Sequence, residues 1–272
     1  MDKREKLVQT ETGFDNNRIS YFEELITPLD LQSIVPNNFY LKKKINNQRT
    51  IVENIINKKD NRLLIIVGPC SIHNVEQAKE YALLLNKLAE KVKDKIYIVM
   101  RVYFEKPRTT TGWKGFINDP DLNNSFDVNK GLKEARLLLL YLAGLGMPIG
   151  CEILDPITAQ YISDFVTWGA IGARTTESQT HRQMVSGLSF PIGFKNGTLG
   201  SVDIAADAMC SARYSHCFMG ITDEGKPTIC RTRGNPHTHI ILRGGKNSPN
   251  YDKDSITNAE KILREKKENI RL

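Results

Sequence analysis

The sequence from Leu63 to His73, LLIIVGPCSIH, joins five consecutive apolar residues to a glycine and a proline. Five apolar residues in a row have the length of a buried strand, and Gly68-Pro69 ends that strand in a turn. A dinucleotide-binding sheet carries a G-x-G-x-x-G turn after its first strand, and no such second glycine follows Gly68. We therefore favour a (β/α) barrel over a Rossmann-type sheet.

Apolar stretches of strand length alternate with amphipathic helical stretches from residue 61 onward. This alternation is typical of a parallel sheet covered by helices. The predicted strands are Leu63–Val67, Ile96–Met100, Met147–Ile153, Ala170–Ala173, Ile192–Phe194 and His239–Leu242. The predicted helices are Glu76–Val92, Lys130–Leu145, Ile157–Val166, Ser178–Gly187, Ser201–Ala212 and Ile256–Asn269. The sequence thus predicts an α/β fold of the (β/α)8 TIM-barrel type with about six of the eight strands.

Two segments lie outside this alternation. Residues 1–60 are predicted to form an N-terminal extension with an oligomeric or regulatory role, and residues 61–272 form the barrel domain. Within the extension, residues 46–60 are predicted as a helix, because their apolar residues recur at helical spacing. Residues 216–233 are predicted as an inserted β-hairpin that turns around residues 223–227.

Composition and charge limit the class of protein. The chain has 272 residues, of which 40% are hydrophobic and 25% are charged, as in globular proteins. Its longest apolar stretch, Leu137–Cys151, contains glycines and a proline and is shorter than the roughly 20 residues of a membrane span. Five cysteines without a CxxC pair, and no secretory signal, indicate a reduced cytoplasmic protein. A net charge of +7 is compatible with nucleic acid, an anionic membrane surface or anionic small substrates.

Four predicted strands end on a cation. Arg101, Arg174, Lys195 and Arg243 each come directly after an apolar stretch. Because barrel active sites form at the carboxyl ends of the strands, we expect these side chains to converge on one mouth. Guanidinium groups bind phosphate or carboxylate through paired hydrogen bonds, and an ammonium binds them as a point charge. The pattern favours a polyanionic small molecule over nucleic acid, which is usually bound by basic patches interleaved with aromatic residues.

Other chemically active groups lie near the same predicted strand ends. Glu152 is expected to be ionised among the cations, either as an acid or base or as a salt-bridge partner. Cys70 is a structural thiol, a nucleophile or a soft metal ligand, and its place at the mouth favours a ligand. His73 either shares this site, caps the next helix or faces solvent. Four further residues match no compact zinc spacing and are interpreted as structural: Cys217, Cys230, His237 and His239.

Six motifs occur in order along the chain and together identify a family. They are GPCSIH at 68–73, RVYFEKPRTT at 101–110, GWKG at 112–115, GARTTES at 172–178, GFKNGT at 193–198 and LRGGK at 242–246. From about Tyr21 to its end, the chain resembles the class I 3-deoxy-D-arabino-heptulosonate 7-phosphate (DAHP) synthases. The resemblance implies a metal-dependent condensation of phosphoenolpyruvate with erythrose 4-phosphate and water, which gives DAHP and phosphate. This reaction is the first step of the shikimate pathway to chorismate and the aromatic amino acids.

The resemblance also implies roles for the residues that match the motifs. Phosphoenolpyruvate is expected on four cations and two backbone positions: Arg101, Arg174, Lys195, Arg243, Gly172 and Ala173. Erythrose 4-phosphate is expected on three side chains: Lys106, Arg108 and Thr109. Catalytic roles fall to Lys106, Glu152 and Lys195. Cys70 becomes a ligand of a divalent ion of the Mn, Fe, Zn or Co type.

Regulation by an aromatic amino acid is a further implication. The effector is expected near Leu188, Ser189, Phe218 and Gly220. Gly220 stands where other members of the family have serine, and this favours tyrosine as the effector. The resemblance also implies a homo-oligomer for a full-length chain.

The family pattern continues with two further strands, which supply a histidine in a D-[FC]-S-H-[AG]-N motif, a glutamate and an aspartate as metal ligands. No such motif occurs up to Leu272. The expectation is therefore an incomplete barrel with two free sheet edges and Cys70 alone at the metal site. An alternative is a non-catalytic truncated chain or pseudoenzyme that acts through a full-length partner, and taken alone the 272-residue chain is expected to be inactive or unstable.

Two further alternatives remain, one from another class of protein and one within the enzyme class. A basic nucleic-acid-binding protein is suggested by the net charge alone. A 3-deoxy-D-manno-octulosonate 8-phosphate synthase would share the barrel and the chemistry. The KPRTT motif at 106–110 and the GARTTES motif at 172–178 favour the four-carbon sugar of the DAHP synthases.

Overall fold

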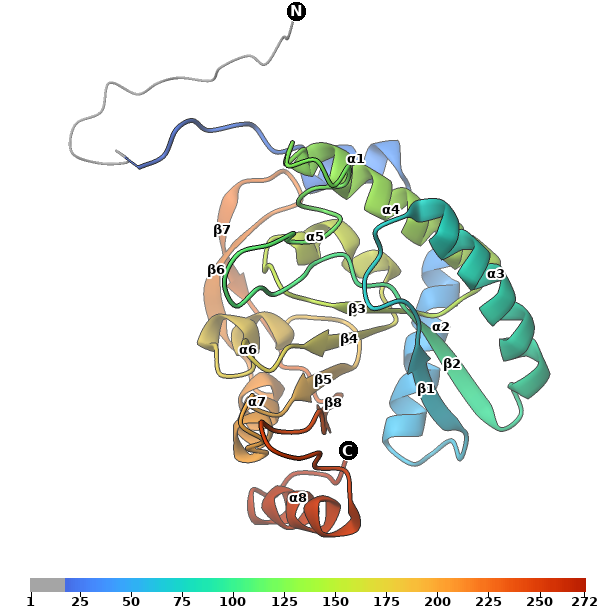
Figure 1. The fold of residues 1–272 in the computed structure, drawn as a ribbon, viewed down its shortest axis with the longest axis vertical. Coiled ribbons are helices and arrows are strands. Elements are labelled where there is room, and N and C mark those ends of the chain that lie inside the picture. Colours follow the sequence, from blue (N-terminus) through green and yellow to red (C-terminus); the bar gives the residue numbers. More distant parts are fainter. Residues whose placement is uncertain (1–17) are drawn as a thin grey trace, which may run out of the picture.

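Six parallel strands form one curled sheet in a computed structural model that describes residues 18–272. The strand order is β1-β2-β3-β4-β5-β8, so neighbours in the sheet follow one another along the chain (Figure 1). The strands are β1 (Leu63–Val67), β2 (Ile96–Arg101), β3 (Ile149–Glu152), β4 (Trp168–Ile171), β5 (Ile192–Lys195) and β8 (Thr238–Ile241). The predicted TIM-barrel type of fold with six strands is confirmed, and β1 and β8 form the two edges of the sheet.

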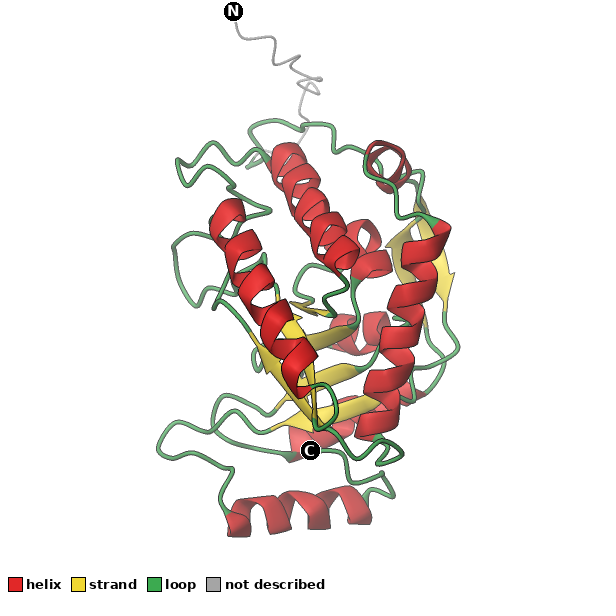
Figure 2. Ribbon diagram, turned by 90° about the vertical axis from the view of Figure 1, so that its right-hand side faces the viewer, coloured by secondary structure: helices red, strands yellow, loops and turns green. Residues whose placement is uncertain are grey.

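A helix follows each of the six strands and lies on the outside of the sheet, as Figure 2 shows. The helices are α3 (Val75–Val92), α4 (Val128–Leu145), α5 (Thr158–Ile162) with the 3-10 turn η1 (Ser163–Phe165), α6 (Gln179–Val185), α7 (Asp203–Arg213) and α8 (Lys253–Glu265). Polar side chains start four of them by accepting a backbone N–H of the first turn: Asn74, Asp127, Ser178 and Asp252. The alternation of strand and helix therefore corresponds to repeated βα units.

The predicted hairpin is confirmed as a separate two-stranded sheet. Strands β6 (Cys217–Ile221) and β7 (Pro227–Arg231) pair antiparallel, with Phe218 opposite Cys230. Gly225 in the turn has a φ of +74°, a conformation that glycine adopts without a steric penalty. Figure 1 shows the hairpin beside α5 and α6 and outside the main sheet.

Two helices precede the first strand. α1 (Pro28–Ile34) and α2 (Phe39–Ile56) are capped by Thr27 and Asn38. The sequence predicted only the helix over residues 46–60. The observed helix starts earlier because the Asn38 side chain accepts the N–H of Leu41, and it ends at Ile56. The first 17 residues of the predicted extension lie outside the described residues.

Helix α2 closes the amino-terminal end of the curled sheet. Val52 is fully buried and belongs to the same apolar cluster as Val99, Tyr103 and Trp168, on the inside of the curl. A larger apolar cluster lies between the strands and the surrounding helices and includes residues of α1 and α2. The carboxyl ends of the strands stay uncovered by α2, so charged side chains can gather there. Within residues 18–272, no helix has the length and apolar character needed to cross a bilayer.

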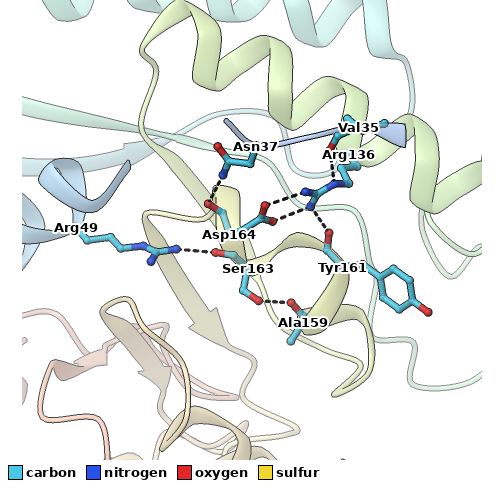
Figure 3. A network of polar contacts seen from close by, with 8 residues as sticks. All are labelled: Val35, Asn37, Arg49, Arg136, Ala159, Tyr161, Ser163 and Asp164. Atoms are coloured by element: carbon cyan, nitrogen blue, oxygen red, sulfur yellow. Dashed lines mark hydrogen bonds and ion pairs between the residues drawn. The ribbon is translucent and has the colours of Figure 1, made fainter. Parts of the chain in front are cut away.

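A buried polar network connects α2 and the segment before it to the barrel (Figure 3). The Arg136 guanidinium on α4 is fully buried and forms two hydrogen bonds with Asp164 of η1, at 2.7 and 2.8 Å. Arg136 Nε donates to the carbonyl of Val35 at 2.9 Å. Arg49 of α2 donates to the carbonyls of Val166 and Ser163 at 2.9 and 2.6 Å. These contacts fix the N-terminal helices to the outer layer of the barrel.

Candidate active site

Three charged side chains from β2, β3 and β5 lie at the same end of the curled sheet. Arg101 ends β2, Glu152 ends β3 and Lys195 ends β5. Side chains on a strand alternate between its two faces, and Val99, two residues before Arg101, lies in the cluster inside the curl. Lys195 Nζ lies 3.4 Å from Glu152 Oε2. The structure thus brings together three of the side chains that the sequence predicted at one mouth.

The ring of Tyr103 forms a platform for the cations. The Arg101 guanidinium carbon lies 3.7 Å from the ring centroid, and Lys195 Nζ lies 5.5 Å from it. Tyr103 is buried, and a cation over an aromatic face is stabilised by the ring quadrupole. Sequence reasoning did not predict this role, although Tyr103 lies inside the RVYFEKPRTT motif.

Arg101 retains an unused hydrogen-bond donor. Its Nη2 donates to the carbonyl of Cys70 at 3.1 Å. Its Nε is buried and has no hydrogen-bond partner within residues 18–272. A buried N–H of a charged group is costly without an acceptor, so this atom fits an anionic ligand.

The local charges act on Lys195 in opposite directions. Burial lowers the pKa of Lys195, and the nearby positive charges of Arg101 and Arg243 lower it further. The carboxylate of Glu152 opposes them and raises it. Glu152 is itself buried, so the pair stays close and partly screened from water. The ammonium of Lys195 is therefore suited to an additional negative charge, which would restore its preference for the protonated form.

Gly172 provides the space that Glu152 occupies. A Cβ atom at position 172 would lie 2.6 Å from Glu152 Oε1, closer than side-chain carbons are found. The carbonyl of Gly172 accepts the hydroxyl of Thr176, whose Oγ1 also donates to the carbonyl of Lys195 at 2.9 Å. The backbone at Gly172 and Ala173 is therefore held against the end of β5.

Cys70 lies on the opposite side of this group, next to Lys106. Lys106 Nζ lies 3.2 Å from the Cys70 sulfur. The hydrogen bond and the charge of Lys106 lower the pKa of the exposed Cys70 thiol, so its thiolate forms more readily than that of a free cysteine. Among residues 18–272, no three His, Cys, Asp or Glu side chains are arranged to hold a metal ion. Cys70 is therefore a candidate ligand without partners in the described part of the chain.

The loop after β2 carries Lys106, Arg108 and Thr109. Arg108 Nε donates to the carbonyl of Trp113 at 2.6 Å across the loop. Arg174, which follows β4, donates from Nη1 to the carbonyl of Pro107 at 2.9 Å. The loop after β2 and the end of β4, two strands separated by β3, are thus connected directly, while Thr109 is exposed.

Arg243 follows β8 and is positioned by a residue that the sequence did not single out. The fully buried side chain of Asn196 accepts the backbone N–H of Arg243 at 2.8 Å and donates to the carbonyl of Gly244 at 3.0 Å. Asn196 follows Lys195 directly in the GFKNGT motif, so one short segment places cations on two strands. In the sequence, the signal that could have identified Asn196 is a turn-forming residue directly after a predicted cation.

A cavity of about 630 Å³ lies on the outer side of the barrel, between α5, α6 and the hairpin. All four predicted effector residues line it: Leu188, Ser189, Phe218 and Gly220. Cys230 faces Gly220 in this cavity, and a Cβ atom at position 220 would lie 2.6 Å from its sulfur. We call this cavity the effector pocket.

The remaining predicted residues lie elsewhere. His73 is exposed, and the neighbouring Asn74 caps α3, so the histidine is not the cap. The ring of His239 accepts the indole N–H of Trp168 at 2.9 Å, and burial lowers its pKa to about 4. His237 lies 3.7 Å from Glu53 on α2. These contacts agree with a structural role for the two histidines.

Comparisons with known proteins give one consistent answer. A family model described as the DAHP synthetase I family matches residues 39–271. The Tyr-sensitive phospho-2-dehydro-3-deoxyheptonate aldolase of Salmonella typhimurium is 51% identical over 251 residues, which cover 92% of this chain and 70% of the relative. The Trp-sensitive enzyme of Escherichia coli K12 is also 51% identical, over 92% of this chain and 72% of the relative. The solved structure of the aldolase from Francisella tularensis SCHU S4 superposes with a TM-score of 0.89 at 48% identity and covers 91% of this chain and 72% of its own.

Proposed function

Because the chain belongs to the DAHP synthetase I family, we propose that the cations at its strand ends hold phosphoenolpyruvate and erythrose 4-phosphate. The family reaction condenses these two phosphates with water to DAHP and inorganic phosphate, the first step of aromatic amino acid biosynthesis. The observation that carries the assignment is the Arg101–Tyr103–Lys195 stack, in which a buried donor of Arg101 lacks an acceptor within residues 18–272.

Phosphoenolpyruvate is assigned to the deeper part of the site. Arg101, Lys195 and Arg243 offer three positive charges to its phosphate and carboxylate. Arg174 and the backbone at Gly172 and Ala173 complete this set. Bringing two anionic substrates together costs free energy in water, and fixed cations reduce that cost before the reaction begins.

Erythrose 4-phosphate is assigned to the loop after β2. Arg108 and Thr109 would bind its phosphate, and Lys106 would lie near its aldehyde. In the reaction, C3 of phosphoenolpyruvate forms a bond with the aldehyde carbon, whose oxygen takes up a proton. Water then adds at C2, and phosphate leaves. We assign proton delivery to the aldehyde oxygen to Lys106, and orientation of Lys195 and of the attacking water to Glu152.

The family generally depends on a divalent metal ion, which would polarise the aldehyde. One cysteine does not make a site for such an ion, and the described residues offer Cys70 alone. The roles proposed for the protein's own groups are therefore confined to binding, orientation and proton transfer.

The effector pocket is proposed to bind an aromatic amino acid, as the Tyr-sensitive and Trp-sensitive names of the relatives suggest. We favour tyrosine, because a Cβ atom at position 220 would lie 2.6 Å from the Cys230 sulfur, so a serine in place of Gly220 would push Cys230 aside and change the shape of the pocket. Gly220→Ser is expected to weaken tyrosine binding, and Cys230→Ala in the same chain should restore part of the loss. Calorimetry with tyrosine, phenylalanine and tryptophan tests this, and equal affinity for all three would refute the preference.

A homo-oligomer and a reducing cytoplasmic environment complete the proposal. Met219 and Ile229 are 91% and 67% exposed on the outer face of the hairpin, as expected for a face that another copy covers. All five cysteines are free thiols. Light scattering tests the oligomer, and a monomer at every concentration would refute it.

The active-site assignment is tested by binding and turnover with matched variants. Lys195→Met and Arg243→Ala are each expected to weaken phosphoenolpyruvate binding by about tenfold or more, because each removes a charged hydrogen-bond donor. As the control, Lys93→Ala removes an exposed lysine at the C-terminal end of α3 and should leave the affinity for phosphoenolpyruvate unchanged. Phosphoenolpyruvate affinity that is unchanged in both site variants would refute the assignment. Product formation with arabinose 5-phosphate in place of erythrose 4-phosphate would point to the octulosonate reaction instead.

A further inference from the structure

Glu105 lies between the substrate loop and the first turn of α5. Its side chain is 4% exposed, and its carboxyl accepts hydrogen bonds from the backbone N–H groups of Leu154 and Asp155. Thr158 Oγ1 lies 3.4 Å from Glu105 Oε1. None of the binding or proton-transfer roles falls to Glu105, although it directly precedes Lys106.

The backbone of Glu105 fixes the loop that carries Lys106. Glu105 forms a β-bridge with Gly115, and the N–H of Lys106 donates to the carbonyl of Lys114 at 2.8 Å. Gly115 has a φ of +116°, and a Cβ atom there would collide with the carbonyl of Phe104. The two ends of the loop are therefore held together at Glu105, and a shift of this residue moves both.

The segment that binds the Glu105 carboxyl also forms one wall of the effector pocket. Gln160 Nε2 donates to the carbonyl of Ile221 on β6 at 3.0 Å, which connects α5 to the hairpin. A ligand in the pocket would therefore contact the same short segment that holds Glu105. The residues of this segment that line the pocket are Pro156, Ile157, Ala159 and Gln160.

A second connection leads from Leu154 to α6. The Leu154 carbonyl oxygen lies 2.7 Å from His181 Nε2, and His181 Nδ1 lies 2.9 Å from the hydroxyl of Ser178, the N-cap of α6. Leu154 thus binds Glu105 through its N–H and His181 through its carbonyl. Two residues of α6 line the effector pocket: Thr180 and Met184. Helix α5 is therefore connected to Glu105 through Thr158, and α6 is connected to it through Leu154.

We propose that Glu105 is a positioning residue that transmits occupancy of the effector pocket to the substrate loop. The inference rests on the proposed effector pocket and adds the route by which it acts. A ligand that shifts the first turn of α5 changes the hydrogen bonds of the Glu105 carboxyl, and Lys106 moves with it. Because Arg174 donates to the carbonyl of Pro107 in the same loop, the shift reaches the phosphoenolpyruvate site.

The Glu105 carboxyl also changes charge near neutral pH. Burial raises its pKa to about 8, and the negative charge of Asp155 adds to this, while the hydrogen bonds from the backbone and from Thr158 act in the opposite direction. The titratable groups that face it are Asp155 on the loop before α5 and Cys151 on β3. An ionised carboxylate accepts stronger hydrogen bonds than a neutral carboxyl, so the connection should tighten as the pH rises through about 8.

The test measures how L-tyrosine changes the Kd of phosphoenolpyruvate, by isothermal titration calorimetry on the 272-residue chain. Saturating tyrosine is expected to raise this Kd at least about fivefold in the unaltered chain, the lower end of ordinary allosteric coupling. In Glu105→Ala, the change should fall below about twofold, while the affinity for tyrosine itself stays within about twofold. Glu90→Ala removes an exposed carboxylate on α3 and serves as the matched control, in which the coupling is retained.

Glu105→Gln supplies a second, milder variant. Its amide keeps an oxygen acceptor of the same size but cannot ionise, so its coupling should stay constant between about pH 7 and pH 8.5, where the coupling of the unaltered chain rises. A merely structural role of Glu105 would not produce this difference between the two pH profiles. If Glu105→Ala binds tyrosine and keeps the full coupling, or Glu105→Gln follows the profile of the unaltered chain, Glu105 is not the transmitter and the effector pocket stands. An unaltered chain that binds no tyrosine refutes the pocket and the transmission with it.

Discussion

The buried guanidinium of Arg136 allows a quantitative prediction about the connection between the N-terminal helices and the barrel. Arg136 has no exposed surface, and Asp164 is the carboxylate paired with it (Figure 3). In Asp164→Ala, the guanidinium keeps its hydrogen bonds to the carbonyls of Val35 and Tyr161 but loses its counter-charge. Removal of one partner of a buried pair typically costs about 3–5 kcal/mol. The Asp164 side chain is 26% exposed, so water partly screens the pair and we expect the lower end, about 3 kcal/mol.

The reverse substitution separates charge from hydrogen bonding. In Arg136→Met, the partly exposed Asp164 carboxylate can be hydrated, but the carbonyls of Val35 and Tyr161 lose their donor. Each unpaired buried carbonyl costs about 1–3 kcal/mol. With two such carbonyls, the free energy of unfolding of this variant should fall by at least about 2 kcal/mol. The variant with both substitutions should lose clearly less than the sum of the two single losses, because the guanidinium that lacks a partner in Asp164→Ala is absent.

Urea denaturation followed by circular dichroism measures these free energies of unfolding. Glu90→Ala, which breaks an exposed ion pair with Lys93, is the control and should leave the unfolding midpoint unchanged. A loss of less than about 1 kcal/mol in Asp164→Ala, or strict additivity of the two single losses, would contradict the reasoning.

Three further outcomes concern the site. Between about pH 5 and pH 8, folded Glu105 retains a proton that the unfolded chain has released. The free energy of unfolding should therefore fall as the pH rises and become constant above about pH 8. In urea titrations, Glu105→Gln should remove most of this dependence on pH. Gly172→Ala should displace the Glu152 carboxylate from Lys195 and weaken phosphoenolpyruvate binding by about tenfold, with the unfolding midpoint unchanged; an unchanged affinity in calorimetry would contradict this. Because burial lowers the pKa of Lys195, the affinity for phosphoenolpyruvate should weaken as the pH rises through that lowered pKa. In Lys195→Arg, calorimetry should show this decline only at higher pH, because a guanidinium keeps its charge. Identical pH profiles for Lys195→Arg and the unaltered chain would refute the role of the lysine.

The strands could be predicted from sequence where an apolar stretch ends sharply at a charged or turn-forming residue. β1 and β5 are of this kind, and their predicted and observed starts coincide. β4 was predicted at residues 170–173, but it runs from Trp168 to Ile171. Gly172 already belongs to a turn, because its carbonyl accepts the N–H groups of Thr175 and Thr176. The start of β4 was missed because Trp168 lies in the apolar cluster inside the curl, a position that only the curled sheet defines.

The cations could be predicted, but the residues that orient them could not. A cation after an apolar strand is visible in sequence, because the strand must meet water at its end. Tyr103 and Asn196 act through contacts with residues on other strands, namely the stack with Lys195 and the hydrogen bond to Arg243. Such contacts depend on how tightly the sheet curls and on which face each side chain takes. In the sequence, these two residues are only an aromatic and a turn-forming amide beside a conspicuous motif.

The arrangement of strands and helices also explains why the effector pocket and the substrate site can communicate. α5 and α6 each begin a few residues after a strand end that carries a substrate-site residue, Glu152 before α5 and Arg174 before α6. The inner end of each of these two βα connections lies at the proposed substrate site, and residues of the helix that follows line the effector pocket. In the proposed transmission, a ligand in that pocket acts on the segments that follow these strand ends, and Glu105, in the loop after β2, contacts the first residue of α5. Coupling between the two sites then needs only a small displacement of two helix starts, with no change in the sheet.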